Sequence, residues 1–90
     1  MYFVYILYSP SRNRYYVGYT GQLADRFLRH SQGRSKSTKA GCPWVIACLE
    51  KFDSASAAYQ RESAIKRKKS RKFIEQLCKS YVSNPFPLPV

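Results

Sequence analysis

A chain of 90 residues has room for one domain with a single small core. Its 16 lysines and arginines outnumber 5 acidic residues and give a formal net charge of +11. The aromatic content of 16 % excludes a disordered basic tail. The positive charge makes nucleic acid the leading class of partner. The alternative is a domain whose charge serves only to keep it in solution.

The cysteines and the hydropathy pattern argue against a zinc-stabilised, secreted or membrane-spanning protein. Three cysteines without a C-x-x-C pair, together with one histidine, argue against a structural zinc site. The apolar N-terminus lacks the basic lead of a signal peptide, and no run approaches the roughly 20 apolar residues that cross a bilayer. We therefore expect a cytoplasmic protein with reduced cysteines and no membrane segment.

The first predicted unit is a β-hairpin. Two tyrosine-rich and β-branched runs, 1–8 and 15–19, flank a turn that contains Pro, Ser and Asn. Tyr5 and Tyr16 lie near each other if the register pairs them, but a one-residue slip sends them to opposite faces, and the sequence does not fix the register. Gly18 in the second strand permits a bulge or the close approach of another backbone.

A first helix and a basic connector follow the hairpin. Thr20 is placed to cap a helix over 22–32, in which apolar residues recur at helical spacing. Arg26 and His30 are four residues apart and therefore share a face of this helix. The connector 33–43 is rich in Gly, Ser, Thr and basic residues, which is typical of a solvated loop that can also contact phosphates. The phosphate-binding candidates in this loop are Arg34, Lys36 and Lys39.

A third strand and a second helix are predicted next. β-Branching and the preceding proline indicate a strand over 44–52. Asp53 and Ser54 can cap a helix over 55–69. Strict alternation along the strand would place three residues on one face: Val45, Ala47 and Leu49.

The second helix carries a carboxylate on its apolar stripe. An ionised carboxylate facing the core is costly unless it is paired or bound to a cation, so Glu62 needs an explanation. A pair with Lys66, one turn on, is the simpler explanation, but its worth of about 0.2–0.5 kcal/mol does not account for the position on the stripe. We therefore predict that Glu62 binds a metal ion. The stripe consists of Ala55, Ala58, Tyr59, Glu62 and Ile65.

A third helix and a tail complete the chain. Ser70 can cap a helix with an apolar stripe that ends at Tyr81. The expected organisation is one domain over 1–82 and a tail over 83–90, where three prolines interrupt any regular helix. The order β-β-α-β-α-α predicts an α+β fold, a three-stranded antiparallel sheet flanked by helices. Non-specific phosphate contacts are expected from the basic run between the last two helices, with candidates Lys66, Arg67 and Lys69.

The residue inventory restricts the chemistry that the domain can perform. Five acidic residues, most of them suited to caps or exposed positions, are too few for a two-metal carboxylate cluster. A single carboxylate suits one Mg²⁺ or Mn²⁺ that keeps most of its waters and shares a phosphate oxygen. Arg26 can hold the charge that builds on a pentavalent phosphorus. A tyrosine near that metal can lose its proton below its usual pKa of about 10 and accept one from water.

The ordered set of these residues resembles a known family. Val4-Tyr5, ten intervening residues and then Tyr16-Val17-Gly18 resemble the paired motifs of the GIY-YIG nuclease superfamily. The similarity covers nearly the whole chain and is closest to small stand-alone bacterial members, although Phe3 stands where the motif has Gly and valines replace Ile. The matching residues are Tyr5, Tyr16, Gly18, Arg26, His30 and Glu62.

The resemblance implies metal-dependent hydrolysis of a DNA phosphodiester in one step, without a covalent enzyme intermediate. It implies Tyr5 as general base or water-positioning group and Tyr16 as a hydrogen-bonding group at the scissile phosphate. It also implies Arg26 as electrostatic stabiliser and Glu62 as the metal ligand. His30 matches a family histidine that takes the proton onward from Tyr5.

The substrate is the least determined part of the prediction. Asn84 resembles a late family asparagine near the site, but it lies in the proline-rich tail. Family nucleases with known targets usually carry a second DNA-reading domain, for which this chain has no room. We expect recognition of DNA shape, or of a damaged or branched form, in repair or processing, with a homodimer or a separate targeting partner left open. A non-catalytic nucleic-acid-binding module and a structural or ribosome-associated basic protein are the alternatives.

Overall fold

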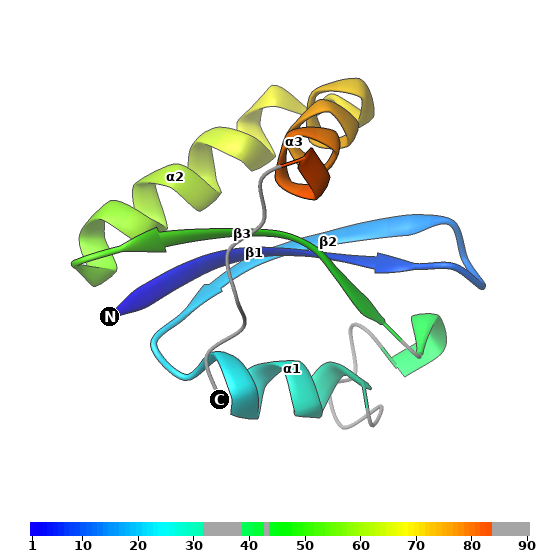
Figure 1. Ribbon diagram of the computed structural model, residues 1–90, viewed down its shortest axis with the longest axis horizontal. Coiled ribbons are helices and arrows are strands. Elements are labelled where there is room, and N and C mark those ends of the chain that lie inside the picture. Colours follow the sequence, from blue (N-terminus) through cyan, green and yellow to red (C-terminus); the bar gives the residue numbers. More distant parts are fainter. Residues whose placement is uncertain (32–38, 43, 84–90) are drawn as a thin grey trace.

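The computed structural model describes residues 1–31, 39–42 and 44–83 (Figure 1). A three-stranded antiparallel sheet with three α-helices confirms the predicted α+β fold and the order β-β-α-β-α-α. No helix in these ranges is long and apolar enough to span a bilayer. The elements are β1 (Tyr2–Ser9), β2 (Arg14–Thr20), α1 (Leu23–Ser31), the 3-10 helix η1 (Lys39–Gly41), β3 (Val45–Phe52), α2 (Ala55–Lys68) and α3 (Arg71–Ser83).

The sheet separates two layers of helices. Its strand order is β2-β1-β3, so the first strand is central and the other two form the edges. Figure 1 shows α2 and α3 over one face of the sheet and α1 over the other. Because β1 is covered on both faces, its residues from Phe3 to Leu7 are all buried, which explains why the sequence shows no polar face there.

The hairpin register settles the question that the sequence left open. Tyr5 pairs with Gly18 and Leu7 pairs with Tyr16, so the two tyrosines are diagonal neighbours on the same face of the sheet. The turn closes through Asn13, which adopts a left-handed conformation with φ 52° that asparagine tolerates better than most residues.

The two faces of the sheet pack different kinds of side chain. The face under α2 and α3 holds a mainly aliphatic cluster, and the stripe of α3 packs against it as predicted. The face over α1 holds an aromatic cluster, to which Phe27 and Tyr16 also belong. The buried members under α2 and α3 are Val4, Ile6, Val17, Cys48, Ala58, Ile65 and Cys78. The buried members on the α1 side are Phe3, Tyr5, Leu7, Leu23, Trp44 and Leu49.

Two of the three predicted helix caps are present as expected. The Ser54 hydroxyl accepts a hydrogen bond from the Ala57 amide at 3.1 Å, and the Ser70 hydroxyl accepts one from the Phe73 amide at 3.1 Å. Thr20 differs, because its hydroxyl accepts from the Gln22 amide at 2.9 Å, ahead of the helix that begins at Leu23. This contact stabilises the turn into α1 rather than its first helical residues.

A β-bulge overturns one expectation about β3. The pairing of β1 with β3 shifts between Ile6 and Leu7, which leaves Ala47 as an extra residue. Leu49 therefore packs on the α1 side, whereas Ala47 packs against the cluster under α2 and α3, and Val45 is exposed. The predicted common face of these three residues is wrong, because a bulge breaks the strict alternation on which it rested.

Tyr59 corrects the predicted apolar stripe of α2. Ala58 and Ile65 are buried as expected, but Tyr59 is 55 % exposed. Its ring meets that of Tyr19 edge-on, with ring centroids 5.8 Å apart. The ring therefore rests on β2 at the edge of the sheet, outside the core that the stripe was expected to face.

Candidate active site

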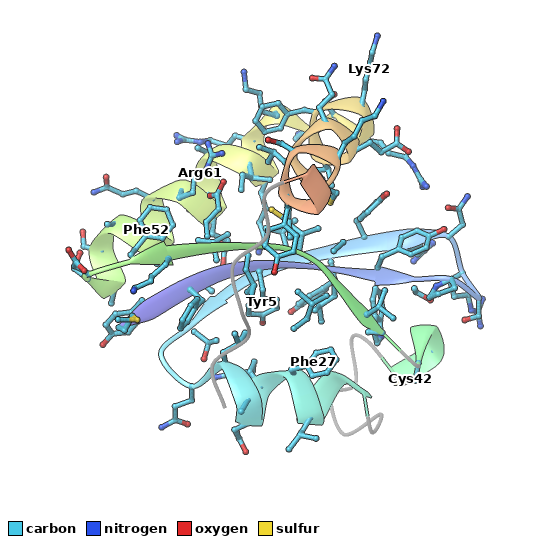
Figure 2. The ribbon with its side chains drawn as sticks, viewed as in Figure 1. Tyr5, Phe27, Cys42, Phe52, Arg61 and Lys72 are labelled. Atoms are coloured by element: carbon cyan, nitrogen blue, oxygen red, sulfur yellow. The ribbon has the colours of Figure 1, made fainter. Side chains whose placement is uncertain are left out.

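Tyr5 on the central strand is the best-defined residue of the candidate site. It is 4 % exposed and points toward α1, from which Phe27 points back at the sheet (Figure 2). The Tyr5 ring lies over Gly18 of the neighbouring strand, and a Cβ on that glycine would overlap the phenol hydroxyl and ring. Because β2 is an edge strand, this position carries the hydroxyl across it to the rim of the sheet. The sequence predicted a bulge or another backbone at Gly18; instead the strand pairing there is regular and the group that lies against the glycine is a side chain.

Tyr16 lies beside Tyr5 on the same face. The ring centroids are 6.4 Å apart and the ring planes differ by 27°, an offset stacked arrangement. Trp44 meets the other side of Tyr16 edge-on at 6.3 Å. The structure thus brings together the two tyrosines that the sequence singled out.

The electrostatic surroundings of Tyr5 link it to three other candidate residues. Burial, with a smaller contribution from the neighbouring Tyr16, raises the pKa of the Tyr5 phenol to about 12. The guanidinium of Arg26 acts to lower this pKa, and the carboxylate of Glu62 acts to raise it. The charges of Arg26 on α1 and Glu62 on α2 thus lie within electrostatic range of the phenol on β1, and Tyr16 of β2 stacks beside it. The phenol keeps its proton there unless a further positive charge arrives.

Arg26 offers an uncommitted positive charge to this place. It lies on the exposed part of α1, and its guanidinium makes no hydrogen bond or ion pair with any residue that the structure describes. Arg61, by contrast, donates two hydrogen bonds to Glu50, from Nε at 2.7 Å and from Nη2 at 3.1 Å. Arg61 therefore ties α2 to β3, while Arg26 remains available to an anion from outside.

Glu62 of α2 supplies the carboxylate of the candidate site. Its side chain is 12 % exposed, and its Oε1 lies 3.2 Å from Nζ of Lys66, one turn on. The pair that the sequence offered as the simpler explanation is thus present. The ammonium of Lys66, a side chain that is itself 54 % exposed, is the ion-pair partner of this carboxylate among the described residues. A nearly buried carboxylate that is balanced by an exposed lysine fits a hard cation, which prefers oxygen ligands and can take the place of the ammonium group.

The donor set fits a cation that brings most of its own ligands. Within the described ranges, no three His, Cys, Asp or Glu side chains gather in a group that could enclose a metal. One carboxylate is enough for Mg²⁺ or Mn²⁺ when waters and a substrate phosphate complete the shell. Glu62 is the residue that would hold such an ion.

Several predicted residues have side chains outside the described part of the structure. The backbone of His30 lies in α1 and that of Lys39 opens η1, but neither side chain is described. Arg34, Lys36 and Asn84 lie outside the described residues altogether. On α2, Lys66 and Arg67 are exposed in the last turn, and Lys69 follows as the C-cap with φ 48°.

The sequence missed the aromatic and cationic groups that flank Tyr16. Trp44 was expected only as the first residue of a strand, and Arg12 and Arg14 only as part of the turn. These three side chains line a pocket of about 180 Å³ beside Tyr16. Arginines interleaved with aromatic residues along the hairpin were a usable signal, because nucleic-acid-binding surfaces combine these types.

Comparison with known proteins agrees with this geometry. The model of the GIY-YIG catalytic domain matches residues 1–75. A UPF0213 protein of Bacillus velezensis is 34 % identical over 91 residues, covering 92 % of this chain and 91 % of that protein. A UPF0213 protein of Natronomonas pharaonis is 40 % identical over 65 residues, covering 71 % of this chain and 75 % of that protein.

A third relative extends the range of organisms. A UPF0213 protein of Listeria monocytogenes is 42 % identical over 66 residues, covering 72 % of this chain and 73 % of that protein. The names of these relatives state no activity. No solved structure matches the chain at a significant level.

Proposed function

The chain belongs to the GIY-YIG family, a family of nucleases that generally use divalent metal ions, and we propose that it is an endonuclease that hydrolyses DNA phosphodiester bonds with one Mg²⁺ or Mn²⁺. The observation that carries the proposal is the buried phenol of Tyr5, which stacks beside Tyr16 and whose pKa responds to the charges of Arg26 and Glu62. A basic surface of net charge +11 supplies the attraction for the polyanionic substrate.

Glu62 is proposed as the ligand of the divalent cation. Support comes from its low exposure of 12 % and from its ion pair with Lys66, whose side chain is mostly exposed and can be displaced. A bound divalent cation would supply Lewis acidity at the phosphate oxygens and favour deprotonation of nearby groups. Lys66 now balances part of the Glu62 charge, and its 54 % exposure lets it swing into solvent when another cation takes its place.

Tyr5 is proposed to orient the attacking water and accept its proton. Its pKa of about 12 keeps the phenol protonated in the metal-free protein, so it can act as a base only when positive charge lowers that pKa. Arg26 already acts in this direction, and a cation on Glu62 would outweigh the carboxylate that now opposes it. Tyr16, stacked beside Tyr5, is proposed to donate a hydrogen bond to the scissile phosphate.

Arg26 is proposed to stabilise the charge that develops on the phosphorus in the transition state. Its guanidinium is permanently charged and has no partner within the part of the chain that the structure describes, so binding a phosphate costs it no existing ion pair. His30, one turn later on α1, is proposed to take the proton onward from Tyr5. Gly18 contributes by its lack of a side chain, which leaves room for the phenol.

The remaining predictions about the substrate stay proposals. Candidates for phosphate contacts are the exposed Lys66, Arg67 and Lys69, the loop residues Arg34, Lys36 and Lys39, and Asn84 near the end of the chain. We propose that the enzyme acts in the cytoplasm on DNA of a particular shape, such as branched or damaged DNA, in repair or processing. A homodimer or a separate targeting partner would add specificity to a domain of this size.

The test is a cleavage assay on plasmid and branched DNA with Mg²⁺ or Mn²⁺. We expect cutting that stops on chelation and falls about 10²–10³-fold in Arg26→Ala, the range seen when one transition-state donor is removed. Lys51→Ala is the matched control, because it removes an exposed positive charge on β3, at the opposite edge of the sheet from β2. Cutting that survives both chelation and Arg26→Ala would overturn the proposal.

A non-catalytic nucleic-acid-binding module is the second candidate. The Glu62–Lys66 pair favours it, because this carboxylate already has a cationic neighbour at 3.2 Å. This candidate predicts binding that weakens steeply with salt, needs no divalent ion and is unchanged in Glu62→Gln. Metal-dependent cutting by the purified protein would eliminate it.

A further inference from the structure

The pocket beside Tyr16 lies outside the proposed catalytic group but adjoins it. Its volume is about 180 Å³, and it opens between the hairpin and the segment that leads into β3. Typical small-molecule sites have volumes of about 300–1,000 Å³, so this one suits a single ring or an anion rather than a whole cofactor. Tyr16 belongs to its lining and to the stacked pair with Tyr5, so an occupant would lie next to the proposed scissile phosphate.

The buried part of the lining is aromatic. Trp44 is 6 % exposed, and its ring meets that of Tyr16 edge-on at an interplanar angle of 62°. Gly41 also contributes to the lining, and a Cβ at this position would overlap the indole. The glycine therefore lets the backbone of η1 lie directly against Trp44. Trp44 thus supports the wall of the pocket from behind, and Tyr16 is the aromatic ring of that wall that stays partly exposed.

The rim of the pocket is cationic. Arg12 is exposed, and its Nε donates a hydrogen bond to the Ala40 carbonyl at 3.2 Å, which holds the guanidinium at the mouth. Arg14 is also exposed, and its guanidinium has no hydrogen-bond or ion-pair partner in the ranges that the structure describes. None of the lining residues that the structure describes is acidic. An anion that enters the pocket would thus meet two arginines next to its aromatic wall.

We propose that this pocket binds one unpaired nucleotide of the DNA strand being cut, with its base against Tyr16, which Trp44 supports edge-on, and its phosphate between Arg12 and Arg14. The proposal rests on the proposed function, because it assigns the occupant to the same DNA strand. Aromatic rings that stack on bases beside arginines that bind phosphates are the usual combination for single-stranded nucleic acid. A paired base cannot enter, because its face is covered by its stacked neighbours and its edge by its partner.

The fluorescence of Trp44 provides a direct readout, because the chain contains one tryptophan. The probe is an eight-nucleotide oligodeoxythymidine, titrated into the protein in the presence of a chelator so that no DNA is cut. We expect saturable quenching of the indole emission, since a base against Tyr16 lies close to the indole that supports this ring and changes its environment. A blunt DNA duplex with a closed hairpin end and inorganic pyrophosphate should each quench much less at equal charge concentration.

Arg14→Gln tests the cationic part of the pocket. At 0.1 M salt we expect its affinity for the oligonucleotide to fall about fivefold, and the slope of log affinity against log salt to decrease by about 0.7, as for one lost phosphate contact on a single strand. Arg14→Lys should restore part of this loss. Lys51→Gln, which removes one exposed charge from β3, should change neither quantity. Both substituted side chains are exposed, so folding should be preserved.

Four results would overturn the proposal. They are an absence of quenching by the oligonucleotide, equal quenching by the closed duplex, equal quenching by pyrophosphate, and an Arg14→Gln variant that binds like wild type. Failure of the proposed function is distinguishable from these results. If the protein quenches as expected but never cuts DNA with metal, the pocket stands and the nuclease proposal falls. If it cuts but shows any of the four results, only the pocket proposal falls.

Discussion

Ile6 and Tyr5 are neighbours on β1, yet they face two different environments. Ile6 points into the mainly aliphatic cluster under α2 and α3, where closely packed side chains exclude water. Tyr5 points into the aromatic cluster on the α1 side, where its phenol is buried but its pKa responds to the charges of Arg26 and Glu62. Both side chains are almost fully buried, so exposure alone does not separate a structural residue from a chemical one. The charges gathered around the polar atom make that distinction.

The largest expected effect concerns Glu62 of α2, the carboxylate proposed to act together with Tyr5. Glu62→Gln keeps the shape of the side chain but removes its negative charge, so we expect metal-dependent cleavage to fall about 10³-fold. DNA binding measured without metal should be retained. Glu75→Gln on α3 is the matched control, because its carboxylate is 51 % exposed and pairs with Arg71. Equal cleavage by both variants would contradict the assignment of Glu62.

The two faces can be separated directly by substituting the neighbouring residues. Tyr5→Phe should reduce cleavage about 10²-fold and cost about 1 kcal/mol of unfolding free energy. Ile6→Ala should cost about 2–5 kcal/mol of unfolding free energy, since it leaves a cavity in the packed cluster, while the folded protein cuts DNA within about threefold of wild type. Urea unfolding and initial cleavage rates measure the two quantities. A Tyr5→Phe protein with full activity would contradict the comparison.

These two residues also show how far the sequence could predict the structure. The hairpin, the Ser54 and Ser70 caps and the stripe of α3 follow from local patterns, and the structure confirms them. Whether Tyr5 and Tyr16 share a face of the sheet depends on the strand register. The register is set by pairing along the whole hairpin, so no local sequence signal predicts it.

The features that the sequence missed arise from contacts between distant segments. The bulge at Ala47 is a shift in the pairing of β3 with β1, so the sequence of β3 alone does not predict it. Tyr59 has the right spacing for the core of α2, but it extends past the sheet to Tyr19 at the β2 edge. The pocket at Trp44 likewise requires η1 to fold back against the hairpin, where the Ser9 hydroxyl donates to the Gly41 carbonyl at 2.6 Å.

A smaller effect is expected from the glycine that makes room for the phenol. A methyl group at position 18 would overlap the Tyr5 hydroxyl, so Gly18→Ala should displace the phenol and reduce cleavage about tenfold. In a Tyr5→Phe background the same substitution should change cleavage much less, because the hydroxyl that it displaces is already gone. Additive losses in the double variant would show that Gly18 acts independently of Tyr5.

The smallest predicted effect is the pH dependence that the Tyr5 phenol gives to the free energy of unfolding. The pKa of Tyr5 is raised to about 12, mainly by burial, whereas an unfolded chain has a tyrosine pKa of about 10. Between these values the unfolded state loses the proton first, so the stabilising contribution is complete below pH 10 and is lost as pH rises toward 12. Urea unfolding at pH 9 and pH 11 should show a larger loss for wild type than for Tyr5→Phe. Parallel losses would mean that burial does not perturb this phenol.

The measurement that tests the central claim most directly is paramagnetic broadening of NMR signals by Mn²⁺. If Glu62 holds one cation beside the phenol, small additions of Mn²⁺ should broaden the ring signals of Tyr5 and the amide signal of Gly18. The methyl signals of Ile6, which points to the other face of the sheet, should broaden only at higher Mn²⁺. The same additions to Glu62→Gln should leave these signals sharp. Broadening that begins elsewhere on the protein, or that persists unchanged in Glu62→Gln, would contradict the account.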